Sequence, residues 1–222
     1  MHWISGVLSR DEIGIIKDTI ETGHFIDGKA TAGYRAKQVK NNLQLQKTDD
    51  QTKALNTLII DALKRNKLFQ TVALPKRIHR PLISRYTAGM HYGRHTDDAL
   101  MDKPNALRTD IAVTVFLNDP NDYAGGELII ETALGEQMVK LESGDAIVYP
   151  ASTLHRVAPV TDGERLVAVT WVQSYIRDPY QREILFDLSR VRQYFDKQTP
   201  ACNETDLTHK VYSNLLRLWA EV

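Results

Sequence analysis

The spacing of apolar residues divides the chain into three regions with different expected structures. In residues 1–76 apolar side chains recur every three or four positions, which is the spacing of one helix face. The clearest cases are Ile13, Ile16 and Ile20, followed by Leu55, Leu58, Ile59, Ala62 and Leu63. Ser9 and Glu12 have the separation of a capping box at the start of the first helix. We therefore expect a mainly helical region that packs on a core formed by the following residues.

Residues 77–176 show short apolar runs bounded by turn residues, which is the pattern of strands. The runs cover residues 80–86, 111–117, 127–131, 137–141, 146–149, 155–160 and 165–172. The β-branched content of 111–117 predicts a buried strand. Thr161-Asp162-Gly163-Glu164 separates the last two runs and predicts a hairpin between them. Many short strands with regular turns indicate a β-sandwich or jelly roll.

Residues 177–222 return to helical spacing. Asp178 and Pro179 predict the start of a helix, because proline suits the first helical turn. The expected apolar stripes are Ile184, Leu188, Val191 and Phe195 in this helix and Leu207, Val211, Leu215 and Leu218 in a second one. These stripes predict packing against the core or against a second subunit, so a homo-oligomer is an expectation. The chain thus divides into a helical region at 1–76, a mainly β core at 77–176 and a helical extension at 177–222.

Composition restricts the partners and the compartment. The 28 basic residues are balanced by 28 acidic residues, so no overall basic field favours nucleic acid or a membrane surface. The apolar run Ile111 to Leu117 is far too short to cross a bilayer. Cys202 is the only cysteine, which excludes an intrachain disulfide and a multi-cysteine zinc site. With no apolar signal segment at the N-terminus, we expect a cytoplasmic protein without membrane or nucleic-acid partners.

His95-Thr96-Asp97 is the only H-x-D triplet in the chain. If it lies on a strand, His95 and Asp97 point to the same side and aim two ligand atoms at one position. A metal held by two histidines and one carboxylate keeps open coordination positions, which is the arrangement of non-haem Fe(II) oxygenases. At this composition chance alone would produce such a triplet about as often as not, so its significance depends on residues later in the chain.

His155 and Arg165 are the residues that give the triplet a context. His155 begins a predicted strand, and a lone histidine there is more often structural than a ligand. Arg165 lies ten residues later and shares strand parity with Val167, Val169 and Trp171. An arginine among apolar residues needs a partner, because a buried unpaired charge is costly. A dicarboxylate would match its guanidinium fork; the alternative is that Arg165 starts the strand and reaches solvent.

The order of these motifs resembles the Fe(II)/2-oxoglutarate-dependent dioxygenases. More narrowly, it resembles the PKHD-type hydroxylases, bacterial relatives of the prolyl 4-hydroxylases, over nearly the whole chain. The resemblance is carried by Ala32-Gly33-Tyr34, Val39-Lys40-Asn41-Asn42, Tyr86-Thr87-Ala88-Gly89, Tyr92-Gly93-Arg94-His95-Thr96-Asp97, Arg108-Thr109-Asp110, Gly125-Gly126-Glu127-Leu128, Leu154-His155-Arg156-Val157 and Leu185-Phe186-Asp187-Leu188.

The resemblance implies a double-stranded β-helix core that holds Fe(II) through His95, Asp97 and His155. It implies that Arg165 binds the distal carboxylate of the cosubstrate 2-oxoglutarate. Tyr86 is expected either to help hold the cosubstrate or to pack in the core. The implied reaction uses O₂ and 2-oxoglutarate to hydroxylate a C–H bond, with L-ascorbate keeping the iron reduced.

The primary substrate is not identified by the sequence. The resemblance implies a peptidyl, prolyl-type substrate and a role in iron handling. The collagen prolyl 4-hydroxylases of animals, however, bind the cosubstrate with a lysine where this chain has Arg165, so their substrate does not carry over directly. Three alternatives are a non-catalytic iron or 2-oxoglutarate sensor, a cupin-type metal hydrolase or isomerase, and a jelly-roll lectin. His91 is expected on the surface or behind the ligands, and Arg94 and Arg156 are expected to face away from the site.

Overall fold

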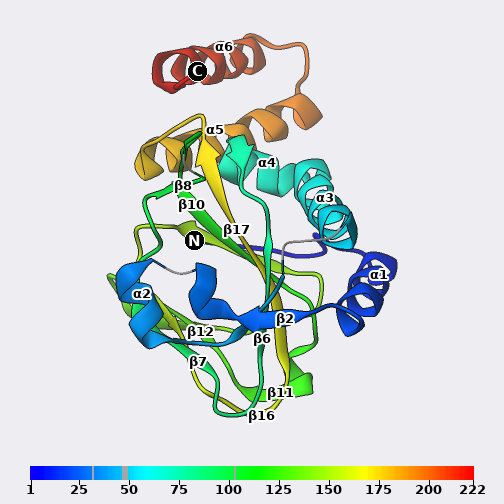
Figure 1. Cartoon of the computed structure of the whole chain (residues 1–222). Coiled ribbons are helices and arrows are strands. Elements are labelled where there is room, and N and C mark those ends of the chain that lie inside the picture. Colours follow the sequence, from blue (N-terminus) through cyan, green and yellow to red (C-terminus); the bar gives the residue numbers. More distant parts are fainter. Residues whose placement is uncertain (32, 47–49, 103) are drawn as a thin grey trace.

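The computed structural model describes residues 1–31, 33–46, 50–102 and 104–222. Two antiparallel sheets form a mainly β core, and helices cover one face of the larger sheet (Figure 1). This architecture confirms the predicted fold class of a jelly-roll core with flanking helices. Ala32, the first residue of the motif Ala32-Gly33-Tyr34, lies outside the described residues.

The larger sheet has the strand order β1-β14-β10-β17-β6-β4-β2, and β5 also pairs with β17. Its strands are β1 (His2–Ile4), β2 (Phe25–Asp27), β4 (Leu43–Leu45), β5 (Pro75–Ile78), β6 (Leu82–Tyr86), β10 (Ile111–Phe116), β14 (Ala146–Pro150) and β17 (Arg165–Ser174). On β10, Ile111, Val113 and Val115 join the apolar cluster under the helices, whereas Ala112 and Phe116 join a second cluster. Burial on both faces explains why this strand is a continuous apolar run.

The smaller sheet has the strand order β13-β12-β15-β7-β3. Its strands are β3 (Lys40–Asn41), β7 (His91–His95), β12 (Leu128–Thr132), β13 (Gly135–Val139) and β15 (His155–Val157). Two separate strand pairs are β8 (Leu100–Met101) with β9 (Leu107–Arg108), and β11 (Tyr123–Gly125) with β16 (Val160–Gly163). Because β7 and β15 are neighbours, His95 and His155 pair directly across the ladder although they are far apart in the sequence.

The helices are α1 (Arg10–Glu21), α2 (Tyr34–Val39), α3 (Asp50–Arg65), α4 (Lys67–Ala73), α5 (Pro179–Gln198) and α6 (Asn203–Trp219), with 3-10 turns η1 (Gly28–Thr31) and η2 (Pro120–Asp122). The predicted capping box is confirmed, since the Glu12 amide donates to Ser9 Oγ at 3.2 Å and the Ser9 amide donates to Glu12 Oε2 at 2.9 Å. The same N-terminal region adds β1, β2, β3 and β4 to the two sheets. Among the described residues, no helix is long and apolar enough to cross a membrane.

The predicted hairpin around Thr161 to Glu164 is wrong. These residues overlap β16, which pairs with β11, whereas β15 pairs with β7 and β12, and β17 pairs with β10, β6 and β5. Gly163 has a φ of +72°, and a Cβ there would lie 2.2 Å from the Asp122 carbonyl oxygen. The glycine therefore allows close approach of β16 to η2 and β11, and the chain changes sheets instead of turning back on itself.

The apolar stripe predicted for α5 is only partly on its inner face. Arg182, Leu185 and Ser189 are the buried residues of this helix, whereas Ile184 and Val191 are exposed. Arg182 is satisfied there because its Nη1 donates to the carbonyl oxygens of Ile176 and Arg177. Polar pairing of this arginine thus replaces part of the expected apolar contact.

Candidate metal and cosubstrate site

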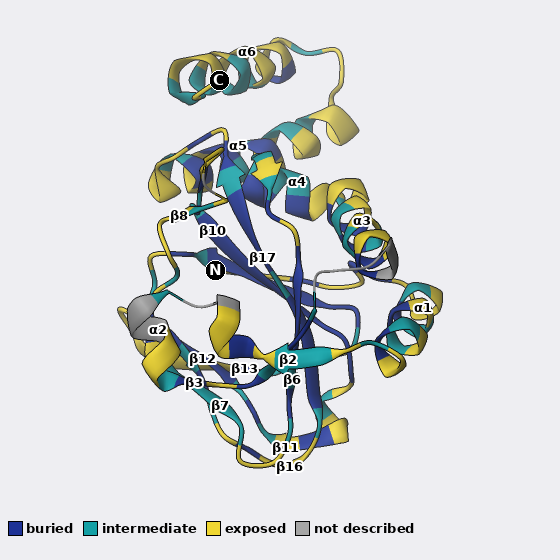
Figure 2. Ribbon diagram, in the orientation of Figure 1, coloured by how far each residue is buried: buried dark blue, intermediate teal, exposed yellow. Residues whose placement is uncertain are grey.

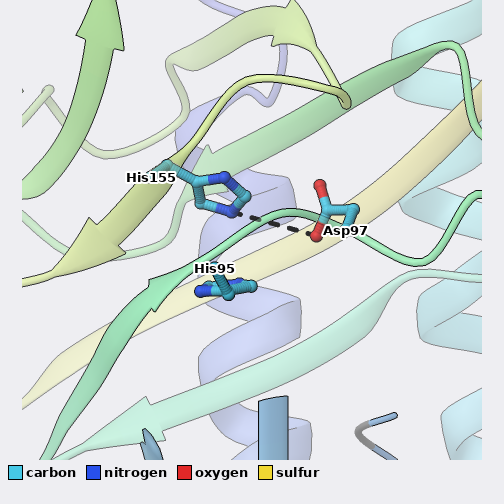
Figure 3. A group of neighbouring side chains, drawn as sticks. All are labelled: His95, Asp97 and His155. Atoms are coloured by element: carbon cyan, nitrogen blue, oxygen red, sulfur yellow. Dashed lines mark ion pairs between the residues drawn. The ribbon is translucent and has the colours of Figure 1, made fainter. Parts of the chain in front are cut away.

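Three potential ligand side chains converge at one end of the smaller sheet (Figure 3). His95 is the last residue of β7 and His155 the first of β15, and Asp97 lies in the loop after β7. One ligand atom from each residue lies within 4.8 Å of the others. The expectation that His95 and Asp97 share a strand face is wrong, because Asp97 lies beyond the strand end and reaches the same position through the loop.

Backbone carbonyl groups fix the orientation of both imidazole rings. His95 Nδ1 lies 2.8 Å from the Gly93 carbonyl oxygen, and His155 Nδ1 lies 2.9 Å from that of Thr153. A carbonyl oxygen only accepts hydrogen bonds, so each Nδ1 carries the proton and each Nε2 keeps its lone pair. His155 Nε2 is 3.8 Å from Asp97 Oδ1. Both imidazole rings therefore present an unprotonated Nε2 towards Asp97, which is the form of histidine that binds a metal.

Burial shifts the pKa values of His95 and Asp97 towards their uncharged forms in the absence of a cation. Burial, together with a smaller effect of His155, lowers the pKa of His95 to about 3. Burial also raises the pKa of Asp97, an effect that the neighbouring His155 opposes. A divalent cation would favour the ionised carboxylate of Asp97, because an opposite charge lowers the pKa of a buried acid.

Arg165 is buried beside this group and does not reach solvent. It is the first residue of β17, is only 1% exposed and pairs across the ladder with Tyr86. Its guanidinium carbon lies 5.1 Å from the centre of the Tyr86 ring and 5.7 Å from that of Phe116. Among the described residues, its Nε and Nη1 have no hydrogen-bond partner. A buried cation with unused donors fits an anionic ligand.

Arg165 lines the same cavity as the three convergent side chains. The walls of this cavity also include Lys40, Asn42, Tyr86, Tyr92, Tyr149 and Trp171. The Trp171 Nε1 and both polar side-chain atoms of Asn42 are buried and have no hydrogen-bond partner in the described part of the chain. Strand parity with Arg165 already placed Trp171 on this face, whereas Asn42 has no signal beyond its motif.

Tyr123 is a residue that sequence reasoning missed. Its hydroxyl group is buried without a hydrogen-bond partner among the described residues, and its ring approaches Gly126, which also packs on the Arg165 side chain. No pattern in the sequence connects Tyr123 with Arg165, because they are on different strands and separated by the whole of β12 to β16.

Arg94, Arg156 and His91, which are close in sequence to the ligand motifs, do not line the cavity. Arg94 pairs with Glu131 and Arg156 pairs with Glu136 on the exposed side of the smaller sheet, as strand alternation predicts. His91 Nδ1 is 3.3 Å from the Gly89 carbonyl oxygen, and His91 is not part of the convergent group.

Comparison with known proteins identifies similar chains. A family profile described as 2OG-Fe(II) oxygenase superfamily matches residues 81–173. A PKHD-type hydroxylase from Synechococcus sp. (strain JA-2-3B'a(2-13)) is 54% identical over 220 residues, covering 99% of this chain and 98% of the relative. A PKHD-type hydroxylase from Picosynechococcus sp. is 51% identical over 218 residues, covering 98% of each chain.

Solved structures with the same fold include two prolyl hydroxylases. The viral collagen prolyl hydroxylase of Paramecium bursaria Chlorella virus-1, in its 2-oxoglutarate complex, has a TM-score of 0.54 and 21% identity, covering 78% of this chain and 95% of that one. The Trichoplax adhaerens prolyl hydroxylase in complex with a hypoxia-inducible-factor peptide has a TM-score of 0.57 and 14% identity, covering 82% and 86%. At these identities the structural similarity supports the fold alone.

Proposed function

Because the chain belongs to the PKHD-type hydroxylases of the 2OG-Fe(II) oxygenase superfamily, it is an oxygenase, and we propose that His95, Asp97 and His155 hold its Fe(II) while Arg165 holds 2-oxoglutarate. The observation that carries this proposal is that a buried arginine with unused donors lines the same cavity as the three convergent side chains. The three convergent side chains fit a metal, and Arg165 beside them fits the distal carboxylate of a dicarboxylate bound to that metal.

The three proposed ligands suit Fe(II) in number and type. Two imidazole nitrogens and one carboxylate leave coordination positions for a cosubstrate and O₂. With iron and O₂ bound, the site would supply the oxidising chemistry that converts 2-oxoglutarate to succinate and CO₂ and inserts one oxygen atom into a C–H bond. The protein contributes the fixed Nδ1–H groups and a buried cavity that limits access of water.

The proposed cosubstrate site is built around the guanidinium group of Arg165. A carboxylate can accept two parallel hydrogen bonds from it, which satisfies donors that have no protein partner among the described residues. Tyr86 packs its ring against the same guanidinium and is proposed to help hold the cosubstrate. The buried hydroxyl group of Tyr123 is proposed as a further donor to the same carboxylate. The cupin-type hydrolase has no need of such a dicarboxylate site.

The substrate, the reductant and the biological role belong to the proposal. We propose a peptidyl substrate with a prolyl-type target as the first class to test, because prolyl hydroxylases share the fold. L-Ascorbate is proposed as the reductant that restores Fe(II), and iron handling in the cytoplasm as the cellular role.

Anaerobic titration of the apo protein tests the site directly. Fe(II) followed by 2-oxoglutarate is expected to give the visible charge-transfer band of a chelated keto acid, and His155→Ala is expected to abolish it. His91→Ala is the matched control, because His91 is close in sequence but outside the convergent group. Iron binding without the band, or a band that persists in His155→Ala, would contradict the assignment.

A further inference from the structure

Large apolar side chains lie exposed along the outward faces of α5 and α6. They are Tyr180, Ile184, Val191 and Tyr194 on α5, and Leu207, Val211 and Leu218 on α6. Within each helix these residues are three, four or seven positions apart, so they form one stripe along the helix. We call them the outward stripes. Figure 2 shows that α6 consists almost entirely of exposed or partly exposed residues.

The fold of a single subunit leaves the outward stripes uncovered. α5 turns Arg182, Leu185 and Ser189 inward, and α6 lies beyond α5, away from both sheets (Figure 1). The contact between the two helices includes an ion pair, with Asp196 2.7 Å from His209 Nε2, and the guanidinium of Arg192 over the Tyr212 ring. In the 17-residue helix α6 only Thr205 is fully buried, while Tyr212, Leu215, Leu216 and Trp219 are partly buried, so the opposite apolar side of the helix stays uncovered.

The charges beside the stripes are ordered along each helix. Arg182 is buried on the inner face of α5; among the exposed charged residues of this helix, the acidic Glu183 and Asp187 come first and the basic Arg190 and Lys197 come later. In α6 the order is the same, at Glu204 and Asp206 and then Lys210 and Arg217. Asp196 departs from this order, but it pairs with His209 within the subunit. Two helices with this order attract each other when they are antiparallel, because each acidic half then faces a basic half.

From the uncovered stripes and the charge order, we propose that the outward faces of α5 and α6 form a twofold interface with a second copy of this chain. The helices of one subunit pack antiparallel on those of the other. A twofold axis suits such a surface, because the acidic half of a helix in each subunit then faces the basic half of the same helix in the other subunit. Exposed Asp187 and Asn214 interrupt the stripes, and single polar positions in an apolar seam restrict helices to one register.

The size of the surface is slightly below that of a standard dimer interface. α5 and α6 contain 20 and 17 residues. Their outward halves supply about 18 residues, close to the roughly 20–30 residues per side of a standard interface. The formal net charge of the chain is zero at pH 7, so overall repulsion does not oppose association.

Size-exclusion chromatography with light scattering on the full chain tests this interface at micromolar concentrations. The expected molar mass is twice the 25.2 kDa of one chain. Combining Ile184→Glu with Val211→Glu is expected to reduce it to the mass of one chain. Leu134→Glu is the matched control, since Leu134 is 94% exposed in the turn between β12 and β13 and is expected to leave the dimer intact.

A second variant tests the charge order separately. Lys210→Glu with Arg217→Glu makes α6 acidic along its length and is expected to weaken the dimer, while circular dichroism shows that every variant remains folded. A single-chain mass for the unsubstituted protein would overturn the proposal. A trimer or larger assembly, or a dimer that persists in the Ile184→Glu and Val211→Glu variant, would overturn it as well.

Discussion

The ring of Tyr92 stacks on the imidazole of His95, with the ring centroids 3.6 Å apart and the planes inclined by 18°. The Lys40 ammonium group lies 5.1 Å from the centre of the same tyrosine ring. The stack acts together with the hydrogen bond from His95 Nδ1 to the Gly93 carbonyl oxygen. Because both contacts act on one imidazole, His95 is oriented before any ligand binds, which makes Tyr92 a positioning residue for the proposed metal site.

Replacing Tyr92 tests this positioning. Tyr92→Leu removes the aromatic stack and is expected to weaken Fe(II) binding about tenfold, a loss usual for residues that support metal ligands. Tyr92→Phe keeps the stack and is expected to bind iron like the parent. Anaerobic Fe(II) titration of the apo proteins measures both. Equal affinities in the leucine and phenylalanine variants would show that the stack does not act on the site.

Arg165→Ala is expected to raise the apparent KM for 2-oxoglutarate while leaving Fe(II) affinity unchanged. A truncated charge-assisted pair in a buried site costs about 2–5 kcal/mol of binding free energy, which corresponds to a large increase in KM. Arg156→Ala is the matched control, because Arg156 pairs with Glu136 on the exposed side of the sheet. Steady-state turnover of 2-oxoglutarate measures both variants, and an unchanged KM in Arg165→Ala would contradict the cosubstrate site.

The lowered pKa of His95 predicts how the stability of the metal-free protein depends on pH. In the unfolded chain this residue has its ordinary pKa of 6.5, whereas in the folded chain its pKa is about 3, so the folded chain takes up the proton only at much lower pH. The unfolded state therefore binds more protons in this interval, and the contribution of His95 to stability is lost as the pH falls from 6.5 towards 3. In His95→Asn this contribution is absent, so urea unfolding should show a shallower loss of stability across the same interval than in the parent.

The elements that the sequence predicted correctly depend on local physics. The capping box of α1 needs only Ser9 and Glu12, and β10 is recognised from a continuous run of β-branched residues. The convergence of His95 with His155 was available only from the family resemblance, because the ladder between β7 and β15 joins residues remote in sequence. No periodicity within one segment contains this information.

The predictions that failed depend on contacts between segments. Asp97 lies beyond the end of β7, and its position is set by the loop there rather than by strand alternation. The segment after Val160 pairs with β11 instead of β17, although its sequence is typical of a turn. In α5 the hydrogen bonds of Arg182 to backbone carbonyl groups place a charged residue on the inner face, which an apolar pattern cannot indicate.

Gly126 offers a test of the proposed cosubstrate site that leaves the polar groups of that site unchanged. A Cβ at this position would lie 3.1 Å from Arg165 Cδ and 2.9 Å from Val160 Cγ2. Gly126→Ala is therefore expected to displace Arg165 and raise the KM for 2-oxoglutarate. Gly135→Ala is a matched control, because both glycines have positive φ but a Cβ at Gly135 meets nothing within 4 Å. Both variants should lose about 1 kcal/mol of stability to backbone strain, so a KM change shared by both would assign the effect to strain rather than to contact with Arg165.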